Sequence, residues 1–368
     1  MASASPLPQP VILPISNAVE QPFQWLFDSL KGQSASVPDL YQIFPNVPIP
    51  EARHDYHLVR EVVDTWLSRF VEDNAIRAKL QAADFAKFAN LWYGGISLDR
   101  CQTIAAYGAW LGAFDDEMEE YALSGDRVAA SQTAEEAILV FEYCFGQSAF
   151  YGARPQPRSL VMQGFIDIGD QFRRGLSQAS RKRFLTELRD FTFAVAQTQN
   201  IRERGSLLDF NSYIARRYHV SAVRTALAML DFAYGYSIPE CTFEDEAFID
   251  IWQRTSFILA MTNDIISLQK EFNAGEIDNG ILVLIYHHQS NLQTAIDVAV
   301  QLCHDNYEAL LDAECYLKTG PEEMHPDVFD FVDRCKGFCL NTVHWSYING
   351  RYIKPGALDA NRRLLIQL

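Results

Sequence analysis

Apolar residues recur every three or four positions through most of the chain after residue 50, and the alternating pattern of half-buried strands is nearly absent. Prolines, which interrupt helices because they lack an amide donor, are concentrated in the first fifty residues, and three long later stretches contain none. This distribution is typical of antiparallel helices with short connections. We therefore predict an all-α fold, with a proline-rich irregular segment at 1–50 and a single helical domain at 51–368.

Three of the predicted helices carry candidate chemistry. The first extends from a capping residue at Ser97 to Gly125, and the second covers roughly 244–273. The central stretch of the second helix, TSFILAMTNDII, is apolar on nearly every side, which is typical of a helix in the middle of a bundle. The third extends from about residue 328 to Gly350.

Acidic residues crowd the end of the first of these helices: Asp115, Asp116, Glu117, Glu119 and Glu120. Their charges repel one another and oppose the negative end of the helix dipole, so a solvated acidic helix end is one interpretation. However, Asp115 and Glu119 continue an apolar stripe that includes Tyr107 and Leu111, which predicts a position at the rim of the core. Carboxylates that face a cavity at this spacing favour a hard cation such as Mg²⁺.

A second set of oxygen-bearing residues lies on the apolar helix. Asn263, Ser267 and Glu271 are separated by four-residue steps, so an amide oxygen, a hydroxyl and a carboxylate share one helical stripe. They are either core polar groups bonded within the protein or ligands of another hard cation. The flanking Asp264 and Lys270 favour the metal site over a merely structural role.

Composition and charge exclude two classes of binding partner, nucleic acids and anionic membranes. The chain holds 31 Lys and Arg against 47 Asp and Glu, a formal charge of −16, and 48% of its residues are hydrophobic. Binding to nucleic acid or to an anionic membrane needs clustered basic residues, which this sequence lacks. We expect neither partner, and an anionic substrate would have to be bound by a few placed cations or by metal.

The cysteines and the first residues indicate the compartment. The seven cysteines are odd in number and form no CxxC pair, which favours free thiols in a reducing compartment. The N-terminus lacks a cationic start followed by an unbroken apolar core, and no stretch of 18 apolar residues occurs. We expect a soluble cytoplasmic protein.

In its motifs the sequence resembles the class I terpene synthases, specifically the single-domain sesquiterpene synthases of microbes and fungi. DDEME at 115–119 matches the family motif D(D/E)xx(D/E), and NDIISLQKE at 263–271 matches ND(L/I/V)xSxx(K/R)E at every specified position. Arg217, 46 residues before Asn263, matches the diphosphate-sensing arginine, and Arg351 with Tyr352 matches an arginine–tyrosine pair. The likeness covers roughly residues 50–355.

The resemblance implies a class I terpenoid synthase helical bundle around a deep apolar cavity. It implies three Mg²⁺ ions, or Mn²⁺ instead, bound by Asp115, Asp116, Glu119, Asn263, Ser267 and Glu271. It also implies a prenyl diphosphate substrate bound by Arg217, Lys270, Arg351 and Tyr352. The implied reaction is loss of diphosphate and cyclisation of the carbocation to a hydrocarbon or alcohol. Farnesyl diphosphate is the expected substrate, with geranyl and geranylgeranyl diphosphates as alternatives.

Other positions are assigned from the same family pattern. Trp345, upstream of the arginine–tyrosine pair, is expected to face the cavity, where an aromatic face stabilises a cation. Arg216 is an alternative to Arg217 as the sensor. Val220 and Ser221 stand where the family often has a polar residue and a glycine whose carbonyl assists ionisation, and Ser221 is small enough for that role.

Movement and assembly are also part of the expectation. Residues 350–368 are predicted to close as a lid, together with the loop at 272–280, when diphosphate binds. The protein is expected to be a monomer or a homodimer.

Two alternatives stand beside the synthase. A chain-elongating prenyl transferase shares the fold but needs two DDxxD motifs, and the sequence has one Asp-Asp pair, at Asp115 and Asp116. The other alternative is a catalytically silent helical scaffold that retains metal-like residues.

Overall fold

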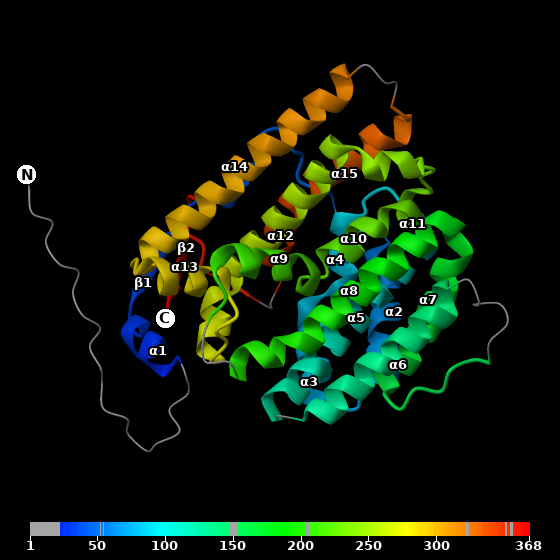
Figure 1. The fold of residues 1–368 in the computed structure, drawn as a ribbon, viewed down its shortest axis with the longest axis horizontal. Helices are drawn as coiled ribbons and strands as arrows, with labels where there is room; N and C mark the ends of the chain where they lie inside the picture. The colour runs from blue at the N-terminus through cyan, green and yellow to red at the C-terminus, as the bar shows by residue number, and fades with distance from the viewer. Residues whose placement is uncertain are drawn as a thin grey trace, which may run out of the picture.

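The computed structural model describes residues 23–51, 53, 55–124, 126–146, 153–203, 207–320, 324–349, 352–353 and 356–368. Most of this part of the chain is helical, and the helices pack side by side as a bundle with α14 along one edge (Figure 1). The α-helices are α1 (Gln24–Leu30), α2 (Tyr56–Phe70), α3 (Asn74–Ala83), α4 (Phe85–Trp92), α5 (Leu98–Ser124), α6 (Arg127–Phe145), α7 (Leu160–Gly175), α8 (Gln178–Glu203), α9 (Phe210–Val220), α10 (Val223–Ala228), α11 (Leu230–Tyr234), α12 (Glu246–Asn273), α13 (Gly280–His288), α14 (Leu292–Thr319) and α15 (Pro326–Ile348). The all-α expectation is confirmed.

The three helices predicted to carry the chemistry correspond to α5, α12 and α15. The N-terminus of α12 is capped by Asp245, whose carboxylate accepts hydrogen bonds from the amides of Ala247 and Phe248. Pro326 begins α15, where its missing amide donor is tolerated because the first turn leaves such donors unpaired anyway. The predicted starts, near residues 244 and 328, lie within two residues of the observed ones.

The two ends of the described chain pair with each other, which differs from the expectation for residues 1–50. β1 (Ser34–Val37) and β2 (Leu364–Gln367) form an antiparallel sheet in which Ser34 lies opposite Gln367. With α1 and the 3-10 helix η1 (Leu40–Ile43), the stretch from residue 24 to 43 has regular structure instead of the predicted irregular course. The strand β1 in this stretch pairs with β2 at the far end of the chain, so no local sequence pattern indicates the pairing.

The same sheet anchors the C-terminus beside α12. The Arg362 guanidinium donates two hydrogen bonds to Asp39, at 2.9 and 2.7 Å. The amide of Gln367 donates to Oε1 of Gln269 at 3.3 Å, and Gln269 belongs to the predicted metal motif on α12. The segment expected to close at 350–368 therefore ends in a paired strand, which confines any closure to the residues before Leu364.

Aromatic packing fixes α5 in the interior. This helix packs against α2, α4, α6, α7 and α8. Trp110 stacks on Phe114, with ring centroids 5.4 Å apart, and lies 4.5 Å from the ring of Phe165 on α7. All three side chains are fully buried. Because Phe114 immediately precedes Asp115, this packing sets the position of the acidic motif.

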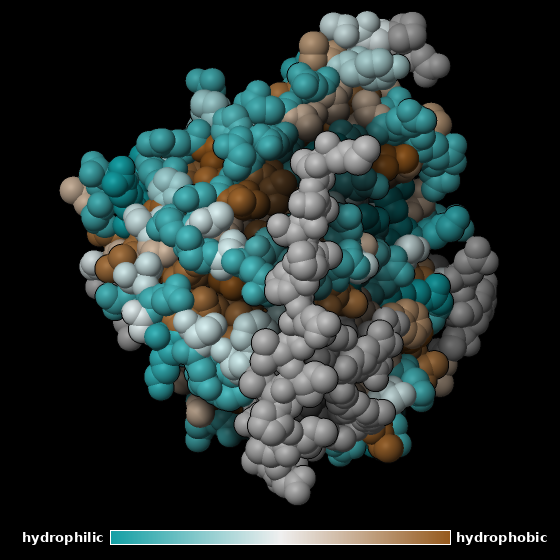
Figure 2. All heavy atoms as spheres, turned by 60° about the vertical axis from the view of Figure 1, so that its left-hand side comes forward, coloured by the Kyte–Doolittle hydropathy of each residue, from teal (hydrophilic) through white to brown (hydrophobic). Residues whose placement is uncertain are grey.

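On the face shown in Figure 2, hydrophilic residues form most of the surface and apolar residues appear as separate patches. Within the described ranges, no helix combines the length and the hydropathy that crossing a bilayer requires. The apolar stretch of α12 is instead packed against α14 and α15.

Candidate active site

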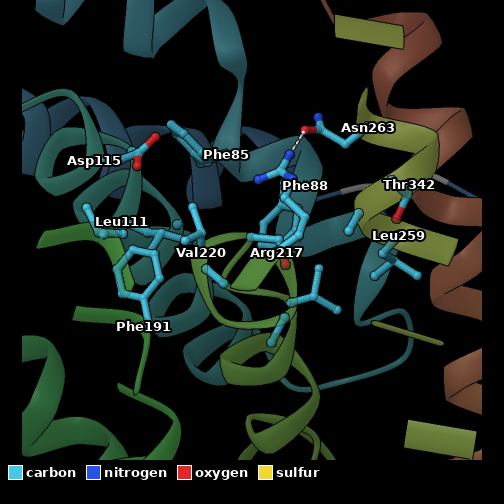
Figure 3. Close-up of a pocket in the computed structure, with 18 of the residues that line it drawn as sticks. Phe85, Phe88, Leu111, Asp115, Phe191, Arg217, Val220, Leu259, Asn263 and Thr342 are labelled. Atoms are coloured by element: carbon cyan, nitrogen blue, oxygen red, sulfur yellow. Dashed lines mark hydrogen bonds between the residues drawn. The ribbon is translucent and has the colours of Figure 1, made fainter. Parts of the chain in front are cut away.

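A cavity of about 390 Å³ lies between α4, α5, α8, α9, α10, α12 and α15. Its wall is largely apolar, and the aromatic lining residues are Phe85, Phe88, Trp92, Tyr107, Phe191, Trp345 and Tyr352. Figure 3 shows Asp115 from α5 and Asn263 from α12 on opposite sides of this cavity, with Arg217 from α9 between them. Two motifs that are far apart in the sequence therefore meet at one cavity.

The consecutive acids of α5 point in different directions. Asp115 lines the cavity. Asp116 is buried and accepts a 2.8 Å hydrogen bond from the ammonium group of Lys79, on α3. Glu117 accepts a hydrogen bond of 2.8 Å from the hydroxyl of Ser159, which caps α7. Among the three, only Asp115 is presented to the cavity, and Asp116 is held by Lys79.

The stripe predicted on α12 presents oxygen atoms that suit a hard cation. Asn263 and Glu271 line the cavity, and Glu271 accepts a 2.9 Å hydrogen bond from the side-chain amide of Asn279. Ser267 lies between them on the stripe, fully buried, and its hydroxyl has no hydrogen-bond partner among the described residues. An unpaired buried hydroxyl costs about 1–3 kcal/mol, which coordination to a cation would offset. The donor set therefore fits a metal ion such as Mg²⁺.

Asp264, next to Asn263, orients the predicted sensor arginine. Its Oδ1 accepts hydrogen bonds from Nε and an Nη of Arg217, at 3.0 and 2.7 Å. Its Oδ2 accepts a 2.6 Å bond from the Tyr213 hydroxyl and a 3.1 Å bond from the amide of Gly280. A Cβ atom at Gly280 would lie 2.8 Å from this oxygen, so glycine permits the close approach of the backbone. The Asp264 carboxylate therefore binds Arg217 and the start of α13, and it does not line the cavity.

Burial and mutual charges shift the pKa values of Asp264, Arg217 and Glu271. Burial raises the pKa of Asp264 above its ordinary value, and the Arg217 guanidinium counteracts that rise. Although burial alone lowers the pKa of Arg217, the Asp264 carboxylate raises it well above its ordinary value, so the guanidinium stays charged. Burial and the charge of Asp264 also raise the pKa of Glu271. A cation beside Glu271 would therefore be stabilising.

A break between α9 and α10 also borders the cavity. Ser221 caps the C-terminal end of α9, and Ala222 follows with a φ of 56°, a left-handed conformation that is uncommon for a residue with a Cβ atom. Both residues line the cavity, and the buried Ser221 hydroxyl has no hydrogen-bond partner among the described residues. Arg217 lines the cavity one turn earlier, whereas Arg216 forms an ion pair with Asp278 and is absent from the lining. The geometry therefore favours Arg217 over Arg216 as the sensor.

Aromatic residues connect α4, α15 and the segment after α15. Trp345 is 8% exposed and lines the cavity, and its ring lies 5.7 Å from that of Phe88 and 6.0 Å from that of Tyr352. Asn263 donates a 3.3 Å hydrogen bond to the Tyr352 hydroxyl. Nζ of Lys270 lies 5.9 Å from the centre of the Tyr352 ring. Tyr352 therefore links the aromatic wall to the α12 motif.

Two of the predicted site residues, the Glu119 side chain and Arg351, lie outside the described residues. Other residues at the site were missed from the sequence because their roles depend on distant contacts: Lys79, Tyr213, Asn279 and Gly280. A signal existed for the last two, since an asparagine before an apolar run indicates a helix start, and Asn279 caps α13 by accepting a hydrogen bond from the amide of Ile281.

A further group of metal-binding residue types lies outside the cavity lining. Glu187, Asp190 and His219 have potential ligand atoms within 4.8 Å of one another. However, Arg224 donates two hydrogen bonds to Glu187, at 2.7 and 2.8 Å. Because this guanidinium already neutralises the carboxylate, we assign no metal to the group.

Comparisons with known proteins give consistent results. A family model described as "Terpene synthase family 2, C-terminal metal binding" matches residues 106–309. Terpene cyclase braA of Annulohypoxylon truncatum is 27% identical over 342 residues, 92% of this chain and 91% of that protein. Sesquiterpene cyclase hepA of Aspergillus oryzae is 23% identical over 351 residues, 91% of this chain and 94% of that protein.

Solved structures show the same fold. Linalool/nerolidol synthase from Streptomyces clavuligerus, in complex with 2-fluorogeranyl diphosphate, superimposes with a TM-score of 0.65 at 20% sequence identity. The alignment covers 88% of this chain and 99% of that one. The helical fold expected from the sequence resemblance is confirmed.

Proposed function

Since the chain belongs to the metal-binding terpene synthase family and is a class I terpene synthase, we propose that it uses Mg²⁺ to convert farnesyl diphosphate into a cyclic sesquiterpene hydrocarbon or alcohol. The observation that carries the proposal is the meeting of two oxygen-rich motifs, from α5 and α12, at one apolar cavity that Arg217 also lines. Carboxylate, amide and hydroxyl oxygens suit Mg²⁺, a guanidinium suits a diphosphate, and the apolar wall suits a prenyl chain.

The chain's own residues would hold the metal from two sides. Asp115 is the proposed ligand on α5, and Asn263, Ser267 and Glu271 are the proposed ligands on α12. We assign Asp116 to positioning, because Lys79 already binds its carboxylate. When bound, Mg²⁺ ions, three by family resemblance and replaceable by Mn²⁺, would stabilise the charge that develops on the departing diphosphate.

Cationic and hydroxyl donors would bind the diphosphate in a chain whose net charge is −16. Arg217, Lys270 and Tyr352 line the cavity, and we propose that Arg351 joins them. The contacts of Arg217 with Asp264 and Asn263 use Nε and one Nη nitrogen, which leaves the other Nη without a partner among the described residues. A guanidinium held in this way is oriented before the substrate binds, so less entropy is lost on binding.

The apolar wall would control the cation after diphosphate leaves. Trp345 and Phe88 present aromatic rings to the cavity, and ring faces attract cations through their quadrupole. Ser221, at the α9–α10 break, would contact the substrate beside Arg217 and assist its ionisation. Burial of these groups excludes water from the reactive intermediate.

A chain length of fifteen carbons is supported by the relatives. HepA carries the name sesquiterpene cyclase, and the match spans most of both chains. Chain elongation is less well supported, because the sequence has one Asp-Asp pair where that reaction needs two DDxxD motifs.

Incubation of the purified protein with Mg²⁺ and geranyl, farnesyl or geranylgeranyl diphosphate tests the proposal. We expect a cyclic hydrocarbon or alcohol from farnesyl diphosphate in the organic layer by gas chromatography. A longer diphosphate in the presence of isopentenyl diphosphate would indicate a prenyl transferase instead. No turnover of any of the three would support the scaffold.

A further inference from the structure

Phe85, the first residue of α4, fits against two glycines of α5. Gly108 and Gly112 are four residues apart on the face of α5 that lines the cavity, and we call this pair the glycine notch. A Cβ atom at Gly112 would lie 2.6 Å from Cζ of Phe85, and one at Gly108 would lie 3.1 Å from its Cδ1. At position 112, therefore, any side chain larger than hydrogen requires the ring to move.

The backbone before Phe85 is fixed from outside the cavity. Asp84 has a φ of 56° and joins α3 to α4, and its carboxylate accepts a hydrogen bond from the amide of Lys87 at 3.1 Å. The Tyr56 hydroxyl lies 2.8 Å from each oxygen of the same carboxylate, and Arg60 forms an ion pair with it at 3.6 Å. These contacts stabilise the left-handed backbone conformation at Asp84, so the start of α4 is not easily displaced.

The open side of the Phe85 ring is the cavity. The Phe85 side chain is 7% exposed, and Leu80 occupies the space next to the notch, where its Cδ2 would lie 3.0 Å from a Cβ atom at Gly112. Asp115 follows Gly112 by one turn, and Figure 3 shows Phe85 next to Asp115 on this side of the cavity. A ring displaced from the notch would therefore move into the space beside Asp115.

We propose that the glycine notch determines product specificity, because it seats Phe85 against α5 and keeps the space beside Asp115 open for the prenyl chain. The inference rests on the proposed function, which places the diphosphate end of the substrate near Asp115. The position of the Phe85 ring then determines the conformation of the prenyl chain next to the carbon that loses diphosphate. This conformation of the substrate determines which of its double bonds reacts with the cation.

Three variants test this coupling: Gly112→Ala, Phe85→Leu and the double variant. Gly164→Ala in α7 is the matched control, because a Cβ atom there would lie 2.8 Å from the rings of Phe70 and Trp66, neither of which lines the cavity. Each variant is assayed for KM and product ratio with farnesyl diphosphate, for binding of inorganic diphosphate with Mg²⁺, and for its thermal unfolding midpoint.

We expect Gly112→Ala to raise KM about tenfold and to change the product ratio, with diphosphate binding within about twofold of wild type. Leucine lacks the Cζ atom that the added methyl would strike, so the double variant should bring KM back to within about threefold of wild type. Gly164→Ala should lower the unfolding temperature and leave the product ratio unchanged.

The proposal is overturned if the two cavity substitutions act independently, if Gly112→Ala behaves as wild type, or if the control shifts the products equally. Should Gly112→Ala fail to fold, Gly108→Ala replaces it, with a milder 3.1 Å contact to Cδ1 of Phe85. Leucine also carries Cδ atoms, so the partner substitution in that comparison is Phe85→Ala. A wild-type protein without turnover contradicts the proposed function. If the wild-type protein turns over farnesyl diphosphate but the effects of Gly112→Ala and Phe85→Leu are independent, only the role of the glycine notch is contradicted.

Discussion

Arg217 of α9 is bound to Asp264 of α12 through two hydrogen bonds, at 3.0 and 2.7 Å. The same guanidinium donates a 2.9 Å bond to Asn263, the first residue of the α12 motif. The proposed diphosphate sensor and one of the proposed metal ligands are thus held in a single hydrogen-bonded unit. A change in either one should be transmitted to the other through Asp264.

Removing the arginine should leave a buried carboxylate without its cation. Asp264 is fully buried, so we expect Arg217→Ala to lower the free energy of unfolding by about 3 kcal/mol. Arg217→Lys keeps the charge but loses the planar fork, and should recover much of the stability while turnover stays low. Urea unfolding and steady-state kinetics on both variants check this, and equal turnover in Arg217→Lys and wild type would contradict it.

Replacing Glu271 should disturb metal binding more than folding. Glu271→Gln keeps the shape and the bond with Asn279 but removes a charge from the α12 stripe. We expect a loss of about 100-fold or more in kcat and a higher Mg²⁺ requirement. A Mg²⁺ titration of activity measures both. An unchanged Mg²⁺ dependence would show that Glu271 is no ligand, and Mn²⁺ anomalous scattering from crystals with diphosphate locates the ions independently.

Trp345 should act on the products. If its ring stabilises a cation, Trp345→Leu will change the product mixture more than the rate of diphosphate release. A merely structural tryptophan would behave in the opposite way, with lower stability and constant product ratios. Gas chromatography and thermal unfolding of one preparation distinguish the two outcomes.

The Lys79–Asp116 pair should stabilise the end of α5. The Lys79 side chain is 42% exposed, so we expect Lys79→Met to cost about 1 kcal/mol of unfolding free energy. In an Asp116→Asn background, where the charge is already neutral, Lys79→Met should have almost no further effect. A double-mutant cycle by urea unfolding measures this coupling. Additive effects would mean that the pair contributes nothing.

Closure should involve the chain after α15 but spare its last strand. We expect Arg351→Ala to weaken diphosphate binding and to increase acyclic or hydroxylated products, because an incompletely closed cavity admits water. With Mg²⁺ and diphosphate, hydrogen exchange should slow at 272–280 and 350–363. Leu364–Gln367 should stay protected throughout because it pairs with β1. Equal exchange at 272–280 and 350–363 in both states would contradict closure.

What the sequence predicted correctly was local. The helices that carry the motifs follow from the 3.6-residue period, and the four-residue steps from Asn263 to Glu271 place those groups on one stripe without any distant contact. The meeting of that stripe with Asp115 was expected only through the family resemblance, because packing between helices has no local signature.

What the sequence could not predict depends on partners far along the chain. The apolar stripe of α5 indicates the direction of Asp115, but the pairing of Asp116 with Lys79 depends on the packing of α3 against α5. The contact of Phe85 with Gly112 and the pairing of β1 with β2 have the same origin. Such contacts depend on how the elements meet in space.

We propose that the two motifs act together to ionise farnesyl diphosphate and that the cavity cyclises the cation. One reaction tests it directly: purified protein with farnesyl diphosphate and Mg²⁺, in which released diphosphate and the terpene product are quantified together. We expect one diphosphate to be released for each cyclic terpene formed, and neither product when EDTA removes the metal. Two results would contradict the proposed function: as much diphosphate released with EDTA as without it, or diphosphate release accompanied only by acyclic farnesol.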